Sequence, residues 1–440
     1  DLISRPGPRT VLVVGAGLAG LRTAAELRAR GFSGNLTVVG AEEHLPYDRP
    51  PLSKELLSRD APVWLADDLG ADLPALADTL VLGRRVTGLV ADDAGAQVTT
   101  DGPGTPRLGA DVVVLAGGAE AVRPPGWDSA LVLRTLEEAA RLRPRLVPGA
   151  RVVVVGAGWI GAEVAGVAAA AGCAVTVVEA ATAPLSRELG TEVGALTERW
   201  YAAAGVDLRL GTAVEQVTDE GVRVGGPRTA PGSDTLVPAD VVVAAVGSRP
   251  ATRWLAGALP LTARGTVPVD ERGRVLGGPA SVRAVGDCAD LTLPDGRTVP
   301  GGHWDGALQH PAALAADLLG QEVPAPPAPY VFSTQLGHDL TLVGHPSPTA
   351  QVVLRGDPLG AAGWTALYLE RPDAEVGPGE TVLPAPAAGP FRLAAGLTVD
   401  RPRDVGALRR LLAGGGRPPV DTSVLTDPAV PLRRAVRAPG

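Results

Sequence analysis

The sequence contains no methionine, a single lysine and only two cysteines, Cys173 and Cys288. Two cysteines without CxxC spacing are too few for a disulfide framework, which is typical of a protein from a reducing cytoplasm. No apolar run approaches the roughly 20 residues of a membrane helix, and the N-terminus lacks a signal-peptide pattern. The chain begins at Asp1 without Met, so a short leader is expected to be missing. These absences predict a cytoplasmic protein that does not associate with membranes.

The charge balance excludes one further class of function. Aromatic residues make up only 3% of the chain, and the formal net charge is -8. An acidic chain of this kind is not a general nucleic-acid binder, because such proteins carry basic surfaces. The 440 residues are 45% hydrophobic and 20% charged, which is ordinary for a globular protein with a sizeable core. The length indicates roughly three domains of about 150 residues each.

One supersecondary unit occurs twice in the chain. RTVLVVGAG, from residue 9, predicts a buried strand that breaks at Gly15, followed by a helix that stops at Gly31 and a second strand. The same strand–helix–strand pattern returns over residues 150–180. We therefore expect an α/β fold with two Rossmann-like dinucleotide-binding domains.

The first repeat carries a GxGxxG fingerprint between its strand and its helix. The motif consists of Gly15, Gly17 and Gly20, and Glu42 follows 22 residues after the last glycine. The first glycine makes the tight turn, the second lets backbone N–H groups approach a pyrophosphate, and the third lets helix and strand pack closely. The acid accepts hydrogen bonds from a ribose diol, and Glu43 beside it is the alternative acid.

The second repeat has the same arrangement. Gly156, Gly158 and Gly161 stand between strand and helix, and Glu179 follows after 18 residues. A carboxylate at this position repels a 2′-phosphate, so the second site is predicted to prefer NADH over NADPH. Arg187 lies close enough in sequence to weaken that preference. Two dinucleotide sites in one chain suggest two cofactors that pass a hydride between them.

A proline-rich linker at residues 321–329 separates a third region. Beyond it, short alternating segments predict antiparallel strands and residues 404–415 predict a helix, so we expect a C-terminal α+β domain. The last 50 residues hold nine Arg and four Asp, which indicates either a solvated face or a docking patch for an acidic partner. The predicted domains are 1–116 with 239–325 for FAD, 117–238 for NAD, and 326–440 at the C-terminus.

Four segments of the chain resemble one known family. They are PYDRPPLSKE at residues 46–55, GAGWIGAEVA at 156–165, VGDCAD at 285–290 and HWDGALQHPAALAADLLG from residue 303. Together they resemble the FAD-dependent, NADH-using ferredoxin/rubredoxin reductases that feed bacterial oxygenases, within the glutathione-reductase-like flavoproteins. The disulfide reductases of that wider superfamily carry a redox cysteine near the flavin, whereas residues 44–54 contain none, so thiol chemistry is not expected.

The resemblance implies roles for individual residues. FAD would be held by the first fingerprint with Glu42 and Arg49, by Asp287 on its ribityl chain, and by Trp304 near the isoalloxazine and nicotinamide rings. NADH would lie on Gly156, Gly158, Gly161 and Glu179. The alternative readings are a capping residue for Asp287 and a core residue for Trp304. No metal site is predicted.

Lys54 and Glu163 match the pair that these reductases place beside flavin N5. A flavin that accepts a hydride accumulates negative charge, and a fixed cation nearby stabilises the reduced form. A buried ammonium needs a counterion, which a carboxylate on the second fingerprint helix supplies. Lysine is a compact point charge, whereas a broad guanidinium would obstruct the nicotinamide. The alternative is a surface lysine left by chance.

The leading hypothesis is therefore an enzyme that takes a hydride from NADH onto FAD and passes electrons singly to a small iron–sulfur protein of the ferredoxin or rubredoxin type. Thr334 stands where the family more often has Asp, and the helix after residue 303 lacks Arg and Lys, which puts the ferredoxin partner in doubt. The alternatives are an NADH diaphorase or oxidase with quinone or oxygen as acceptor, and an NADH-responsive binding protein similar to apoptosis-inducing factor.

Overall fold

The computed structural model describes residues 7–59, 61–104, 107–225, 235–302, 304–347, 349–371, 382–383 and 390–436. The chain forms two compact units, each assembled from three separate segments. The first comprises Asp1–Asp48, Pro62–Glu120 and Ser248–Pro329, and the second Arg49–Ala61, Ala121–Gly247 and Tyr330–Gly440. Within the described ranges, none of the helices combines the length and the apolar character needed to span a bilayer. The domain boundaries expected from the sequence stay a prediction.

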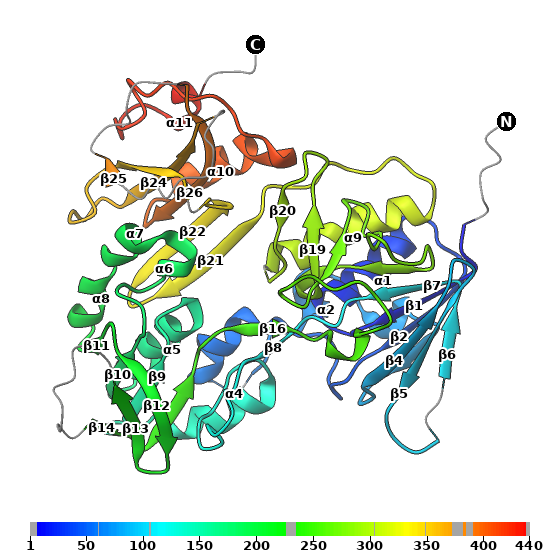
Figure 1. Cartoon of the computed structure of the whole chain (residues 1–440), viewed down its shortest axis with the longest axis horizontal. Helices are drawn as coiled ribbons and strands as arrows, with labels where there is room; N and C mark the ends of the chain where they lie inside the picture. Colours follow the sequence, from blue (N-terminus) through cyan, green and yellow to red (C-terminus); the bar gives the residue numbers. More distant parts are fainter. Residues whose placement is uncertain are drawn as a thin grey trace. The chain divides into compact units, whose positions relative to one another are not determined.

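The first unit is built on a parallel five-stranded sheet (Figure 1). In sheet order its strands are β18 (Val282–Ala284), β7 (Val112–Leu115), β1 (Thr10–Val14), β2 (Asn35–Val39) and β3 (Thr79–Val81). Val11 and Val13 of β1 pack into one core, and Leu12 and Val14 pack into another on the opposite face. Both faces of the sheet are therefore covered, which explains why its central strands are continuous apolar runs.

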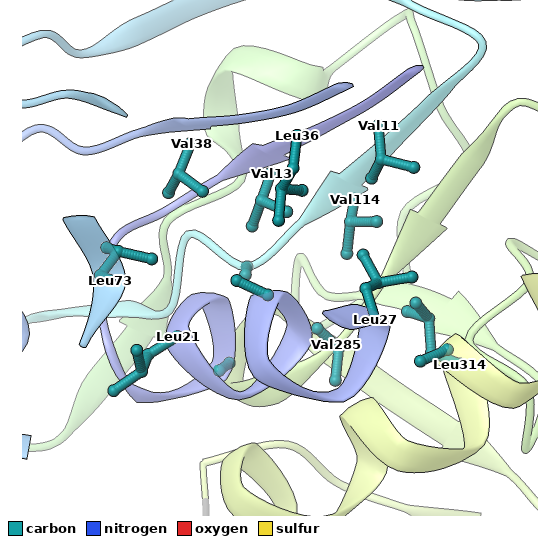
Figure 2. Close-up of a cluster of buried hydrophobic side chains, with 14 of the residues drawn as sticks. Val11, Val13, Leu21, Leu27, Leu36, Val38, Leu73, Val114, Val285 and Leu314 are labelled. Atoms are coloured by element: carbon teal, nitrogen blue, oxygen red, sulfur yellow. The ribbon is translucent and has the colours of Figure 1, made fainter. Parts of the chain in front are cut away.

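Helices cover one face of this sheet. The elements on this side include α1 (Leu18–Ala29), α2 (Leu65–Leu69), α3 (Leu73–Leu76) and α9 (Trp304–Leu318). Figure 2 shows Val13 and Val38 of the sheet pointing toward α1, and Leu314 of α9 close to Leu27 of α1. The packing of α1 against β1 fixes the loop between them, where the first fingerprint lies.

Two smaller sheets cover the other face. The strands β4 (Val86–Ala91), β5 (Ala96–Thr100) and β6 (Arg107–Ala110) form one antiparallel sheet. A second, mixed sheet contains β17 (Val267–Val269), β19 (Ala289–Thr292) and β20 (Thr298–Val299), in which β17 is parallel to β19 and only β20 is antiparallel. Two short 3-10 helices, η4 (Arg253–Leu255) and η5 (Gly286–Cys288), complete this unit. The chain leaves the unit at β8 (Ala119–Ala121) and returns at β16 (Ser248–Pro250).

The second unit contains a parallel four-stranded sheet and an antiparallel three-stranded one. The first has the order β11 (Asp207–Arg209), β10 (Ala174–Val178), β9 (Arg151–Val155) and β15 (Val241–Ala244), and the second has β12 (Ala213–Thr218), β13 (Gly221–Gly225) and β14 (Leu236–Pro238). The helix α5 (Trp159–Ala170) packs against β9 and β10. Outside its C-terminal part, the unit also contains the helices η1 (Pro50–Ser53), η2 (Glu55–Leu57), α4 (Leu136–Leu142), η3 (Arg143–Arg145), α6 (Ser186–Leu189), α7 (Thr191–Ala195) and α8 (Glu198–Ala203).

The C-terminal part of the second unit is a six-stranded, mainly antiparallel sheet. Its order is β21 (Tyr330–Gln335), β22 (His338–Gly344), β26 (Arg392–Val399), β24 (Trp364–Glu370), β23 (Gln351–Arg355) and β25 (Val382–Leu383), with α10 (Pro402–Leu411), η6 (Ala413–Gly415) and α11 (Leu432–Ala435) beside it. One face packs against Leu189 and Trp200 from the segment after β10. The predicted fold class, two Rossmann-like domains and a C-terminal α+β region, is confirmed.

Candidate functional site

The first fingerprint forms the turn between β1 and α1. Gly15 has φ +119°, and a Cβ on it would lie 2.1 Å from the backbone oxygen of Ala116. A Cβ on Gly20 would lie 1.9 Å from the backbone oxygen of Gly15. Side chains are therefore excluded at both positions by the protein's own backbone.

Gly17 differs from the other two glycines of the motif because the space beside it is open. It is the N-cap of α1 and forms no side-chain cap hydrogen bond, and a Cβ on it would meet nothing within 4 Å. The N–H groups of the first helical turn have no intrahelical acceptor, and the helix dipole adds partial positive charge at this end. The open space above them fits a pyrophosphate, as the FAD site requires.

The second fingerprint repeats this backbone arrangement between β9 and α5. Gly156 has φ +104°, and its Cβ would lie 2.4 Å from the backbone oxygen of Ala245. A Cβ on Gly161 would lie 2.0 Å from the backbone oxygen of Gly156, whereas one on Gly158 would meet nothing within 4 Å. Gly158 is the N-cap of α5. The second loop therefore fits a dinucleotide for the same physical reason as the first.

The two acids predicted to bind a ribose have different hydrogen-bond partners. Glu179 accepts hydrogen bonds from the backbone N–H groups of Ala157 (2.7 Å) and Ala181 (2.8 Å). Since Ala157 belongs to the second fingerprint, the carboxylate lies beside the glycine loop and retains lone pairs for a ribose. Glu42 accepts a hydrogen bond from the hydroxyl of Tyr47 at 2.5 Å. Tyr47 was not singled out from the sequence.

A second carboxyl group lies within electrostatic reach of Glu179. Burial raises the pKa of the Glu188 carboxyl, Arg187 opposes that rise, and the charge of Glu179 adds to it. Arg187 is an exposed residue of α6, and its guanidinium would lie 3.9 Å from a Cβ placed on Gly247. The carboxyl groups of Glu179 and Glu188 therefore influence each other in this part of the second unit, and a carboxylate at Glu179 disfavours a 2′-phosphate on the ribose.

The structure brings Lys54 and Glu163 together. The ammonium Nζ lies 3.0 Å from Oε1 of Glu163, and it also donates to the backbone oxygen of Pro50 at 3.3 Å. Lys54 stands between η1 and η2, while Glu163 lies on α5 and is 5% exposed. A buried carboxylate thus accompanies the single lysine of the chain, on the helix whose first turn carries the second fingerprint.

Two serines complete the surroundings of Glu163. The hydroxyl of Ser333 donates to Oε1 at 2.5 Å, and the hydroxyl of Ser53 donates to Oε2. Neither serine was singled out as a site residue from the sequence. The sequence signal for Ser53 was its position directly before Lys54. The structure, by the alternating burial of β21, places Ser333 on the inner face of that strand.

Arg49 lies directly before η1, and its Nη1 donates to the backbone oxygen of Arg134 at 2.7 Å. Its predicted contact with FAD phosphates stays a prediction.

Asp287 is a half-buried residue of η5, directly after Gly286, which has φ +78°. A Cβ on Gly286 would lie 2.9 Å from Cβ of Ala19, so η5 packs on the first turn of α1. Asp287 is therefore close to the first fingerprint.

Trp304 is half-buried and begins the described part of α9, and His303 lies outside the described residues. The indole Nε1 donates to Oδ1 of Asp48 at 2.8 Å, a partner that was not expected from the sequence.

The two cysteines are both free. Burial raises the pKa of the Cys288 thiol to about 11, which disfavours the thiolate needed for redox chemistry.

The chain is similar to proteins of known function over nearly its whole length. The family model for pyridine nucleotide-disulphide oxidoreductases matches residues 9–311. The ferredoxin–NAD(+) reductase component of a p-cumate 2,3-dioxygenase system from Pseudomonas putida is 33% identical over 437 residues, with 96% of this chain and 97% of that protein covered. Putidaredoxin reductase CamA from Pseudomonas putida is 31% identical over 440 residues, with 97% of each covered. The crystal structure of the covalent putidaredoxin reductase–putidaredoxin complex gives a TM-score of 0.79 at 29% identity, over 97% of this chain and 98% of that chain.

Proposed function

Since the chain belongs to the pyridine nucleotide-disulphide oxidoreductase family, we propose that it is an FAD-dependent NADH:ferredoxin reductase. The predicted resemblance to oxygenase-coupled reductases is confirmed by the relatives, and the chain is an oxidoreductase that uses FAD and NADH. FAD held by this chain would supply the chemistry that links a hydride donor to a one-electron acceptor. The protein supplies binding, orientation and a suitable electrostatic environment.

The observation that carries this proposal is the ion pair between half-buried Lys54 and Glu163, a buried carboxylate on the second fingerprint helix. Gly15, Gly17 and Gly20, with Glu42, Arg49 and Asp287, bind FAD, and Trp304 orients the reacting rings. Gly156, Gly158, Gly161 and Glu179 bind NADH. Lys54 provides a fixed positive charge where reduction adds negative charge, and Glu163 balances it in the interior. We assign Lys54, Glu163 and Trp304 to the catalytic site.

The acceptor is a small iron–sulfur protein, as the names of the relatives state for those proteins. The described residues of α9 contain no Arg or Lys. Exposed arginines occur instead on α10 and α11, which pack against each other. They are Arg403, Arg409, Arg410, Arg433 and Arg434. We assign the docking of an acidic acceptor to this face, because opposite charges steer association; Arg437 lies outside the described residues.

We place the protein in the cytoplasm, where NADH is available. Cys173 and Cys288 are both free, and their free state is compatible with a reducing compartment. This location is testable by cell fractionation with antibody detection. Recovery in the periplasmic fraction alone would contradict it.

Glu179→Arg is expected to shift cofactor preference toward NADPH. The change removes the repulsion of a 2′-phosphate, adds a cation, and removes the acceptor for the N–H groups of Ala157 and Ala181. The ratio of kcat/KM for NADPH to that for NADH should rise by about 10- to 100-fold, which corresponds to about 1.4–2.8 kcal/mol. Steady-state kinetics with both nucleotides measure it.

Glu192→Arg is the matched control, because it makes the same charge change at an exposed position of α7. It should leave the ratio close to that of the wild type. An unchanged ratio in Glu179→Arg would show that Glu179 does not bind the ribose.

A reductase assay tests the proposed function. The purified protein should be yellow, release FAD on denaturation, and reduce a dioxygenase-type [2Fe–2S] ferredoxin with NADH faster than it reduces a quinone or oxygen. A colourless protein that cannot be reconstituted with FAD would refute the proposal. Faster reduction of quinone or oxygen would favour a diaphorase or oxidase instead.

A further inference from the structure

The carboxylate of Glu163 is held by more than the lysine. Oε1 accepts hydrogen bonds from Lys54 Nζ at 3.0 Å and from Ser333 Oγ at 2.5 Å, and Oε2 accepts from Ser53 Oγ. The side chains are well enclosed, with Glu163 and Ser53 5% exposed and Ser333 1% exposed. One hydroxyl therefore binds each oxygen of the carboxylate, and the ammonium completes the set.

Gln335 fixes the direction of the hydroxyl proton of Ser333. Its Nε2 donates to Ser333 Oγ at 3.1 Å, and Gln335 is 2% exposed. A hydroxyl has one proton to donate. Because Gln335 is the donor to Ser333, the proton of Ser333 is available for Glu163. If the Gln335 amide were turned so that its oxygen faced Ser333, that oxygen would compete for the hydroxyl proton. Ser333 Oγ and Glu163 Oε1 would then be two acceptors 2.5 Å apart.

These donors come from segments that are far apart in the sequence. Ser53 ends η1, directly before Lys54, while Ser333 and Gln335 lie two residues apart on the same face of β21. The strand β21 contacts α5. A Cβ on Gly166 of α5 would lie 3.0 Å from the backbone nitrogen of Leu336, so the strand end also packs closely on this helix. The C-terminal sheet is thus fixed to the helix that carries Glu163.

We propose that Ser53 and Ser333 are positioning residues, which hold the Glu163 carboxylate in one orientation so that it keeps the Lys54 ammonium in place. This inference rests on the proposed function of Lys54. A carboxylate held at both oxygens cannot rotate about its terminal torsion, which is otherwise broad. Lysine has a flexible four-carbon stem, so the position of its charge depends on the group that binds it. The C-terminal sheet thereby contributes to hydride transfer through Ser333.

Ser333→Ala tests the proposal in the FAD-loaded protein. Loss of one hydrogen bond to a charged group should slow the reduction of FAD by NADH by about 10- to 30-fold, while the dissociation constant of NADH changes by less than about twofold. Ser53→Ala, which leaves β21 intact, should act in the same direction. Ser333→Thr keeps the hydroxyl and should restore most of the rate. Stopped-flow absorbance measures the rate and the affinity together.

Thr334→Ala is the matched control on the same strand. The Thr334 side chain is exposed on the opposite face of β21, and its hydroxyl donates to Asp339 at 2.7 Å. The control variant should reduce at the wild-type rate. An equal loss of rate in Thr334→Ala and Ser333→Ala would show a general effect of the strand and overturn the positioning role.

A second readout does not depend on NADH. Because Lys54 is the only lysine, an amine-reactive reagent reports on this side chain alone, with the N-terminal amine as internal reference. Ser333→Ala and Ser53→Ala should raise the rate of Lys54 acylation by about threefold or more, since the ammonium is held less firmly. Peptide mass spectrometry locates and quantifies the label.

The two measurements separate failure of the inference from failure of the proposed function. A wild-type protein whose FAD is not reduced by NADH refutes the proposed function, and the labelling result then still decides whether the serines position Lys54. Wild-type reduction rates and wild-type acylation in both alanine variants overturn the positioning role and leave the proposed function standing.

Discussion

Lys54→Met is expected to slow the reduction of bound FAD by NADH by about 100-fold, the size of effect typical of removing one preorganised electrostatic group. The fixed charge stabilises the reduced form, so its removal acts on the hydride-transfer step. The dissociation constant of NADH should change by less than about threefold, because the proposed nucleotide site is the second fingerprint with Glu179 and not Lys54. The midpoint potential of the bound FAD should become lower. Anaerobic stopped-flow and a redox titration measure these quantities.

Lys54→Arg is the control for charge alone. It keeps the cation but replaces a compact ammonium with a broad guanidinium, so it should recover only part of the lost rate. In Lys54→Met the carboxylate of Glu163 still accepts hydrogen bonds from Ser53 and Ser333, which allows the fold to persist. FAD content and Tm verify this. A wild-type reduction rate in Lys54→Met would disprove the assigned role.

Gly158→Ala is expected to raise the dissociation constant of NADH by about 10- to 100-fold without lowering the Tm. The added Cβ meets no protein atom within 4 Å. Gly158 has φ -80° and ψ -169°, which alanine adopts without strain. The methyl group therefore occupies only the space that we propose for the pyrophosphate. Titration with NADH and thermal unfolding give the two numbers.

Gly161→Ala separates this effect from damage to the fold. Its Cβ would lie 2.0 Å from the backbone oxygen of Gly156, so this variant should lose stability as well as NADH binding. The contrast between the two glycines is the diagnostic feature. NADH binding by Gly158→Ala that equals the wild type would show that the second loop does not hold the nucleotide.

The glycine loops were predictable from the sequence because their geometry is local. Gly15 and Gly156 must adopt positive φ, and Gly20 and Gly161 must pack against the turn that directly precedes them. Both requirements can be recognised within about 30 residues of sequence, from the apolar strands and the small residues around these glycines. The same locality made the strands of the C-terminal sheet recognisable.

The surroundings of Lys54 were only partly predictable. Its pairing with Glu163 was expected from the family resemblance, since no spacing rule links residues more than a hundred positions apart. Ser53 and Ser333 were missed because their contacts depend on how η1 and β21 each pack against α5, which the sequences of these elements do not specify. The bond from Trp304 to Asp48 was missed for the same reason: the two residues are distant in sequence, and packing brings them together.

The most direct test of the central claim is a single-turnover experiment. The FAD-loaded protein is reduced anaerobically with one equivalent of NADH and mixed with excess oxidised [2Fe–2S] ferredoxin from a dioxygenase system. The account predicts rapid reoxidation of the flavin with two ferredoxin molecules reduced per NADH, because each cluster accepts one electron. A long-lived flavin–NAD+ charge-transfer band that iron–sulfur proteins do not oxidise, and that persists or decays only with quinone or oxygen, would contradict it.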